Sequence, residues 1–363
     1  FNLPALYFIY LNFDYYTKVR VLDIFSNKKT LFNFLKTLPK ADKSASNFAI
    51  RYLEGLTKPI GSLGRLEELA IWLAGWQGNK NKLIIDPVYC ILFCGNHGVV
   101  EEGVSAYPSE VTKQMVENFK NNGAAINHIC DVADIKLIIN PIELDNPTKN
   151  ITKENALKES EVFEAMRIGS NSIPDDAKII LLGEMGIGNT TIASTLSAAS
   201  FGGMGKEWVG PGAGLEKNEI ELKAKIIDRA LTLNYQSKND PITTLKKFGG
   251  RELAAIAGAV IKCRMKRIPV ILDGFVCSAS LSPFVKQFPD LLEHCQVAHL
   301  SSEPGHLLLL DYFCIKPILD LGMGLGEGSG AATVLPIFRA ALAAYNNMST
   351  FAGAGVSEKK RLS

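Results

Sequence analysis

Short apolar runs of strand length recur along the chain, and each is followed by a polar or glycine-rich break and then by a stretch with helical spacing. The runs occupy residues 88–94, 135–139, 178–182, 269–272, 297–300 and 318–321. Continuous apolar runs of this length are typical of strands that are buried on both faces of a parallel sheet. The alternation therefore predicts a doubly wound α/β fold, with a mainly parallel sheet covered by helices on both faces.

The breaks after these runs carry residue types that bind ligands. Nearly every break contains a glycine, a carboxylate or a histidine, as in residues 95–98, 273–275, 301–306 and 322–330. In open α/β sheets, ligands bind beyond the carboxyl ends of the strands. The pattern therefore favours an enzyme site at that edge. Before the first run, residues 28–78 have helical periodicity with an interruption, after which Ser62 or Gly64 is the expected start of the next helix.

Residues 178–196 combine a strand, a glycine loop and a helix start, which together form an anion site because backbone N–H groups and the helix dipole converge there. The spacing nearly matches a nucleoside-triphosphate loop, but Asn189 stands where that motif needs lysine. We therefore expect a site for one phosphate, and we expect Glu184 to bind sugar hydroxyls. A plain strand-to-helix turn is the alternative.

Two further segments carry candidate chemistry. Glu327 lies between glycines, where a carboxylate can act as a general base if ligand binding desolvates it. A structural glycine turn is the alternative. Lys223 lies on the helix after the glycine-rich loop at residues 210–216 and can reach a phosphate as a point charge, although most helix lysines are merely solvated.

The remaining strand-end side chains have weaker patterns. Asp273 either binds substrate or caps its own turn. His97 and His306 each follow a strand, where a lone histidine is more often structural than catalytic. With no cysteine or second histidine at ligand spacing, no metal is expected.

Composition narrows the class of protein. The chain has 363 residues, with 39 Lys plus Arg against 37 Asp plus Glu, so a general nucleic-acid binder is not expected. No apolar run has membrane-spanning length, and the 7 cysteines are scattered without a CxxC pair. We therefore expect a soluble protein in the reducing cytoplasm. Residues 1–25 are aromatic and apolar without signal-peptide features, so an appended segment is expected there.

Taken together, several of these segments resemble the nicotinate-nucleotide:dimethylbenzimidazole phosphoribosyltransferases of cobalamin nucleotide-loop assembly. The matching motifs recur in the family's order from about residue 55 to 345. They are KPIGSLGRLE (58–67), HGV (97–99), GVSAYP (103–108), VTKQM (111–115), GEMGIGNTT (183–191), GGRE (249–252), DGF (273–275) and LGEGSG (325–330).

The resemblance implies transfer of the phosphoribosyl group of nicotinate mononucleotide to a benzimidazole nitrogen, without a cofactor or a metal. On this basis Glu327 is the expected general base, with Glu184 and Lys223 near the nucleotide. The phosphate loop comprises Gly186, Ile187, Gly188, Asn189 and Thr190, and the base pocket Ser105, Gln114 and Leu325.

The resemblance also implies a homodimer and two domains in each chain. We expect a small helical domain from residues 28–82 and 336–363, a catalytic α/β domain at 83–335, and an extension of unknown role at 1–27. The chain departs from the family pattern at Asn96, at Gly324 and in a short segment between residues 140 and 177. These departures leave an alternative open: a catalytically impaired nucleotide-binding paralogue, or one subunit of a heteromeric relative.

Overall fold

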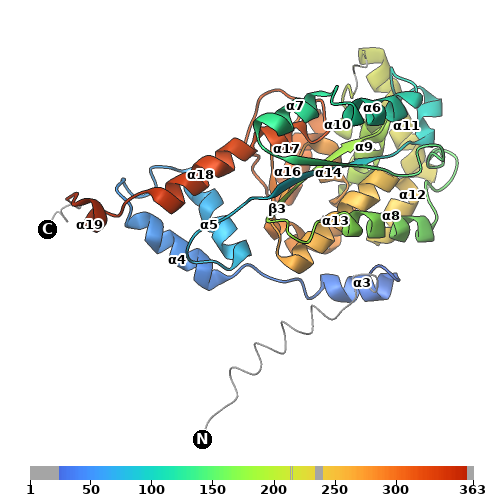
Figure 1. Cartoon of the computed structure of the whole chain (residues 1–363). Coiled ribbons are helices and arrows are strands. Elements are labelled where there is room, and N and C mark those ends of the chain that lie inside the picture. The colour runs from blue at the N-terminus through green and yellow to red at the C-terminus, as the bar shows by residue number, and fades with distance from the viewer. Residues whose placement is uncertain (1–23, 213, 215, 234–239, 358–363) are drawn as a thin grey trace, which may run out of the picture.

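The fold is centred on a five-stranded parallel sheet with the strand order β2-β1-β3-β4-β5 (Figure 1). The computed structural model describes residues 24–212, 214, 216–233 and 240–357. The strands are β1 (Val88–Cys94), β2 (Lys136–Pro141), β3 (Ile179–Met185), β4 (Val270–Leu272) and β5 (Cys295–Val297). This order is that of a doubly wound sheet, whose topological switch point lies between β1 and β3. The predicted fold class is confirmed.

Helices connect the strands and cover the sheet. The β1–β2 connection contains η1 (Gly98–Glu102), α6 (Glu110–Lys120) and α7 (Ala125–Val132), and β2 leads to β3 through α8 (Glu159–Asn171). Between β3 and β4 lie α9 (Asn189–Phe201), α10 (Gly205–Trp208), α11 (Lys217–Leu233), α12 (Pro241–Phe248) and α13 (Arg251–Lys266). Between β4 and β5 lie α14 (Phe275–Ala279), α15 (Ser282–Gln287) and η2 (Pro289–His294). After β5 come α16 (Pro304–Phe313), α17 (Ser329–Thr333), α18 (Leu335–Asn347) and α19 (Phe351–Ala354).

The two faces of the sheet bury two hydrophobic cores, because side chains alternate along each strand. In β1, Ile91 and Phe93 join the core that includes residues of α8, α9 and α13. Cys90 and Leu92 point to the opposite core, which includes residues of α6, α7 and α17. All seven residues of β1 are buried, as its continuous apolar run predicts, whereas the edge strand β2 is partly exposed.

The predicted strand at residues 318–321 is wrong. This segment makes only an isolated parallel bridge, His299 to Leu319, beside the chain that leaves β5. Pro317 directly precedes it, and proline has no N–H to extend a ladder. The run predicted at residues 297–300 is displaced, since β5 covers Cys295–Val297.

Three N-terminal helices precede the sheet: α3 (Lys28–Leu35), α4 (Lys43–Glu54) and α5 (Arg65–Gln77). Gly64 precedes α5 with a φ of 52°, so the second of the two expected starts is the observed one. In Figure 1, α4, α5 and α18 form a helical group beside the α/β body, whereas α3 lies against that body. The rings of Phe32 and Phe288 are 5.9 Å apart there. The domain boundaries at residues 82 and 336 stay a prediction.

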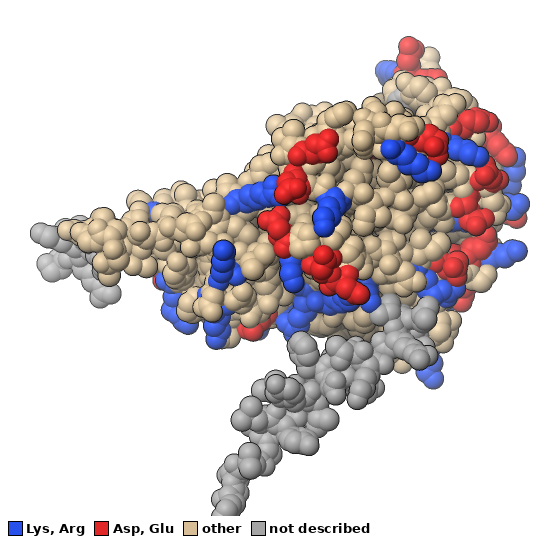
Figure 2. All heavy atoms as spheres, viewed as in Figure 1, with Lys and Arg blue, Asp and Glu red and all other residues tan. Residues whose placement is uncertain are grey.

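Charged side chains of both signs are interspersed on the face shown in Figure 2, in keeping with the formal net charge of +2. Within the described part of the chain, no helix is long and apolar enough to cross a membrane. Of residues 1–27, those before Ile24 lie outside the described residues, and Ile24 and Phe25 are buried in the first core.

Candidate active site

A cavity of about 440 Å³ opens at the carboxyl ends of the strands. It is lined by the loops that follow β3, β4 and β5, together with the segment after η1. The lining residues that carry the argument are Ser105, Glu184, the loop at residues 186–190, Gly212, Glu303, Leu325 and Glu327. Side chains from segments far apart in the sequence therefore meet at the place that the strand pattern predicts.

The loop between β3 and α9 forms one wall of the cavity. Gly188 has a φ of 87°, a conformation that glycine adopts without strain, and α9 begins directly afterwards at Asn189. The first turn of a helix leaves backbone N–H groups without intrahelical acceptors, and the dipole adds partial positive charge. This turn faces the cavity, so its partial positive charge favours an anion there, and the site for one phosphate stays a prediction.

Gly186 is fixed by its surroundings. A Cβ atom at this position would lie 2.6 Å from the carbonyl oxygen of Gly95 and 3.2 Å from Nε2 of His97. Only glycine therefore lets the loop lie this close to the end of β1. The N–H of Ile187 donates to Oγ1 of Thr112 at 3.1 Å, which fixes the loop from the α6 side.

Glu184, in β3, is only 6% exposed and faces the cavity. Asn189 donates a hydrogen bond from its side-chain amide to Oε2 of Glu184. Burial raises the pKa of the Glu184 carboxyl well above its ordinary value, and the nearby carboxylates of Asp273, Glu252 and Glu327 raise it further. A raised pKa favours the protonated carboxyl, which can donate as well as accept hydrogen bonds.

Glu327 lies in a turn with three successive positive φ angles: 79° at Gly326, 60° at Glu327 and 74° at Gly328. Its N–H donates to the carbonyl oxygen of Glu184 at 3.1 Å, so the turn is attached to β3. The residue is 5% exposed, and burial raises the pKa of its carboxyl to about 7, with a smaller contribution from Asp273. A carboxylate with that pKa is suited to accept a proton near neutrality.

Asp273 supports this turn from beneath. Its carboxylate accepts hydrogen bonds from the N–H groups of Gly328 at 3.0 Å and of Ala331 at 2.9 Å. The side chain is fully buried and is not part of the cavity lining. The sequence left open substrate binding or a cap of its own turn; the carboxylate instead bonds a distant turn, where Asp273 anchors the Glu327 loop.

Lys223 lies on α11, next to the first turn of α9. Its ammonium donates to Oγ1 of Thr190 at 2.8 Å and to the carbonyl oxygen of Gly210 at 3.2 Å. Burial lowers its pKa to about 8, and the charge of Glu303 opposes that shift. The lysine is therefore mostly charged at neutral pH and supplies positive charge beside the first turn of α9.

The residues predicted for the base pocket do not all line the cavity. Ser105 and Leu325 line the cavity, whereas Gln114 is exposed on α6 outside the lining. Of the glycine loop at residues 210–216, Ala213 and Leu215 lie outside the described residues. Gly212 lines the cavity beside Thr190.

Sequence reasoning missed two groups beside the cavity. Glu252, at the start of α13, forms a fully buried pair with His97, Nε2 to Oε1 at 2.5 Å, beneath Gly186. The second is Glu303, which is only 5% exposed. The strand-end rule had indicated the segments of His97 and Glu303, but only the fold shows what these side chains contact.

His306 is structural, as its pattern indicated. Its Nδ1 accepts a hydrogen bond from the N–H of Ser301 at 3.0 Å. Its Nε2 therefore carries the proton and faces Oγ of Ser278 at 3.2 Å. Burial lowers the pKa of this imidazole to about 3, so it stays neutral and fixes the loop that leads to Glu303.

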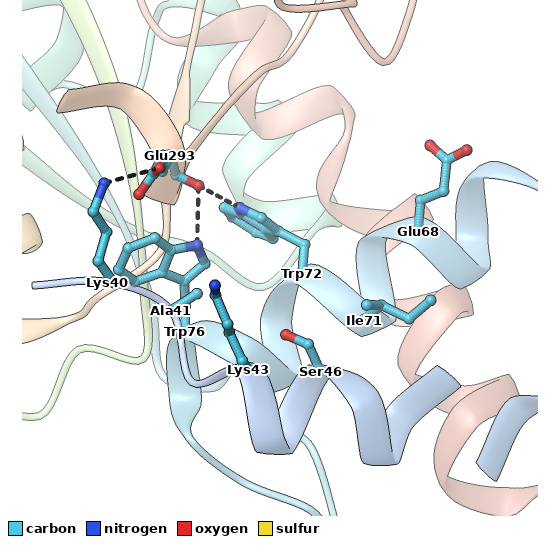
Figure 3. A pocket seen from close by; sticks show the side chains of 9 residues that line it. All are labelled: Lys40, Ala41, Lys43, Ser46, Glu68, Ile71, Trp72, Trp76 and Glu293. Carbon is cyan, nitrogen blue, oxygen red and sulfur yellow. Dashed lines mark hydrogen bonds and ion pairs between the residues drawn. The ribbon is translucent and has the colours of Figure 1, made fainter. Parts of the chain in front are cut away.

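A second, larger cavity of about 580 Å³ lies between α4, α5 and η2 (Figure 3). The indole N–H groups of Trp72 and Trp76 both donate to the carbonyl oxygen of Glu293, at 3.0 and 2.9 Å. Lys40 pairs with the Glu293 carboxylate at 3.2 Å. This cavity lies away from the strand ends and contains neither the glycine loop nor Glu327, so we assign the chemistry to the smaller one.

The chain is similar to known proteins over most of its length. Residues 38–356 match a family model described as "Phosphoribosyltransferase". Two relatives are named nicotinate-nucleotide–dimethylbenzimidazole phosphoribosyltransferase. The one from Novosphingobium aromaticivorans is 44% identical over 324 residues, covering 89% of this chain and 96% of the relative. The one from Rhizobium rhizogenes is 45% identical over 325 residues, covering 90% and 96%.

Solved structures agree with the sequence relatives. The crystal structure of nicotinate-nucleotide–dimethylbenzimidazole phosphoribosyltransferase from Thermus thermophilus has a TM-score of 0.82 and 35% identity, and the match covers 88% of this chain and all of that one. The crystal structure of CobT from Thermus thermophilus has the same TM-score at 36% identity, and the match covers 87% of this chain and all of that one. The chain therefore belongs to the nicotinate-nucleotide–dimethylbenzimidazole phosphoribosyltransferase family.

Proposed function

We infer that the protein transfers the 5-phosphoribosyl group of nicotinate mononucleotide to 5,6-dimethylbenzimidazole or a related azole. The products are α-ribazole 5′-phosphate and nicotinate. The names of the relatives support this reaction. The observation that carries it is that a single cavity contains both the glycine loop before α9 and the carboxyl of Glu327. A phosphate bound at the loop leaves its sugar within reach of a base.

The reaction divides among the residues as follows. The first turn of α9, with Thr190 and the buried charge of Lys223, binds the phosphate. Glu184 contacts the ribose hydroxyls. The azole nitrogen attacks the anomeric carbon while the bond to the pyridinium nitrogen breaks, and its electron pair neutralises that nitrogen. Glu327 accepts the N–H proton of the azole. Attack opposite the departing nicotinate inverts the anomeric carbon.

The incoming base occupies the apolar end of the cavity. The lining includes the apolar side chains of Val104, Tyr107, Met115 and Leu325, and Ser105 contributes a hydroxyl. A flat aromatic ring fits a slot of this composition, since apolar walls bury its faces and a few polar groups fix its orientation. Gln114 is proposed as an outer contact, because it lies on the same helix as Met115.

We propose that the protein acts as a homodimer in the cytoplasm. Two large apolar side chains of the cavity lining are exposed to solvent, Tyr107 by 51% and Leu325 by 55%. A neighbouring subunit that covers them also closes the base pocket. The free cysteines support a reducing compartment. Sedimentation of the purified protein measures the oligomeric state, and a monomer at assay concentration would contradict the dimer.

The deciding experiment removes the general base. Glu327→Gln keeps the shape of the side chain but cannot take up the azole proton at neutral pH. We expect the rate of nicotinate release to fall about 10²–10⁴-fold, with the affinity for nicotinate mononucleotide within a few-fold of wild type. Glu110→Gln, an exposed glutamate on α6, is the matched control and keeps full activity. Wild-type protein that releases no nicotinate with any azole would contradict the proposed reaction.

A further inference from the structure

Glu303 directs its carboxylate away from the helix that it precedes. It is the residue before α16, where the preferred side chains, such as Asp and Ser, accept hydrogen bonds from the first turn of the helix. Within the described residues 303–313, its carboxylate makes no such bond. It turns instead toward the loop before α11, where Oε1 accepts the N–H of Gly212 at 2.7 Å.

The carboxylate of Glu303 therefore lies on the side of the cavity where we propose that the phosphate binds. Gly212 has a φ of 54°, and a Cβ atom at this position would lie 2.9 Å from Oγ1 of Thr190 and 3.2 Å from Nζ of Lys223. The backbone that holds Glu303 thus contacts both side chains that we assign to the phosphate. The charge of Glu303 also raises the pKa of Lys223 against the effect of burial. A backbone N–H and a buried ammonium are groups that bind an anion.

The buried carboxylate of Glu303 is only partly hydrogen-bonded. The residue is 5% exposed, and its Oε2 has no hydrogen-bond partner among the described residues. Oε2 lies against the backbone of Gly210, since a Cβ atom there would be 2.3 Å away. A buried carboxylate with one oxygen unpaired is a costly arrangement, and such groups call for an explanation.

We propose that the carboxylate of Glu303 occupies part of the phosphate site in the free protein. When the nucleotide phosphate binds beside Lys223, this carboxylate gives up the N–H of Gly212. The inference rests on the proposed function in taking this cavity as the nucleotide site. Two anions beside one ammonium repel each other at short range in a buried site. Glu303 therefore weakens phosphate binding and keeps the phosphate-bearing product from being held too tightly.

A neutral side chain at this position tests the proposal. In Glu303→Gln, the amide oxygen still accepts from Gly212, but the negative charge is gone. We expect the variant to bind inorganic phosphate about tenfold more tightly than wild type by calorimetry at pH 7.5. Its affinity for nicotinate riboside, which lacks the phosphate, should be unchanged. Asp311→Asn, an exposed carboxylate on the same helix, is the matched control and should leave both affinities at their wild-type values.

The opposite results are informative. Unchanged, weaker or undetectable phosphate binding by Glu303→Gln overturns the proposal. A loss of riboside affinity without a gain for phosphate would assign Glu303 to the sugar hydroxyls instead. If Glu303→Gln does not fold, Glu303→Met provides a second neutral side chain, and it must give the same gain. The proposed function is judged separately by nicotinate release from the wild-type protein, so either idea can fail alone.

Discussion

The backbone of Glu327 is in a conformation that a residue with a side chain rarely adopts. Its φ of 60° lies between two glycines that also have positive φ, and Asp273 anchors the turn through the N–H of Gly328. A non-glycine residue in this region costs on the order of 1–2 kcal/mol. Strain of this kind persists where the surroundings hold it, and here it directs a carboxyl into the cavity.

The rate of transfer should depend on pH through Glu327. Burial raises the pKa of its carboxyl to about 7, and only the deprotonated form can accept the azole proton. The rate at saturating substrate should therefore fall about tenfold per pH unit below 7 and level off above it. Initial rates between pH 5 and 9 measure this profile. A profile that stays flat down to pH 5 would show that a carboxyl with an ordinary pKa, or none, takes the proton.

Removing that charge should stabilise the fold. The pKa of Glu327 is raised from 4.5 to about 7 on folding, so the native state binds more protons than the unfolded state between those pH values. The penalty of the buried carboxylate is therefore absent below pH 4.5, grows as the pH rises to 7 and is complete above it. We expect Glu327→Gln to raise the free energy of unfolding at pH 8 by on the order of 2 kcal/mol. Urea unfolding at pH 8 and pH 4.5 should show a gain at pH 8 alone.

The side-chain amide of Asn96 donates a hydrogen bond that an aspartate could not donate. Its Nδ2 donates to the carbonyl oxygen of Leu144 at 2.9 Å, and the residue is 7% exposed. Aspartate has no N–H to donate and adds a buried charge next to a carbonyl. Asn96→Asp should therefore lower the free energy of unfolding by about 1–3 kcal/mol at pH 7. The exposed Asn33→Asp is the control, and equal stability of the two variants would contradict this account.

At the level of elements, the sequence predicted the strands whose apolar runs are long and buried. Residues 88–94 coincide with β1, and the run at residues 178–182 overlaps β3, which starts one residue later and continues to Met185. The run at residues 318–321 lies beside the outer strand β5 but forms only an isolated bridge, and hydrophobicity alone does not show how far such pairing extends. Its neighbours, Pro317 and the glycines that follow it, allow only one bridge.

Close contact between α8 and α13 depends on glycine. A Cβ atom at Gly258 would lie 2.0 Å from the carbonyl oxygen of Met166, and one at Gly169 would lie 1.8 Å from that of Ala255. Gly258→Ala must push the helices apart, so it should lower the free energy of unfolding by about 1–3 kcal/mol. Gly55→Ala is the control, because its Cβ atom would lie at ordinary distances of 3.6 Å from the carbonyl oxygen of Tyr52 and 4.0 Å from that of Arg51. If Gly258→Ala melts like wild type, the helices can separate without cost.

At the level of the whole molecule, the site depends on contacts that no local pattern contains. The sequence indicated Glu184, Glu327 and the loop at residues 186–190 one by one, and the strand-end rule placed them at the same edge. It did not show that Asp273 lies under the Glu327 turn or that Glu303 reaches Gly212. Those relations join segments 55 and 91 residues apart, and they depend on side-chain directions that only packing determines.

The attachment of α3 is the clearest case of long-range packing. The family model begins at residue 38, so this helix lies outside the matched region. Leu31 is nevertheless fully buried in the first core, and Lys28 pairs with Asp240 at 3.1 Å. The helix therefore packs as part of the α/β body, and its burial contributes to the free energy of unfolding of that body.

Leu31→Ala should accordingly lower the free energy of unfolding by about 2–4 kcal/mol, because it leaves a cavity between α3 and the body. Lys29→Ala, exposed on the same helix, should change the free energy of unfolding by less than about 0.5 kcal/mol. Chemical denaturation followed by tryptophan fluorescence measures both. If Leu31→Ala unfolds at the wild-type midpoint, α3 contributes nothing to the stability of the body. Since α3 contributes no residue to the cavity lining, transfer activity at low temperature should persist in both variants.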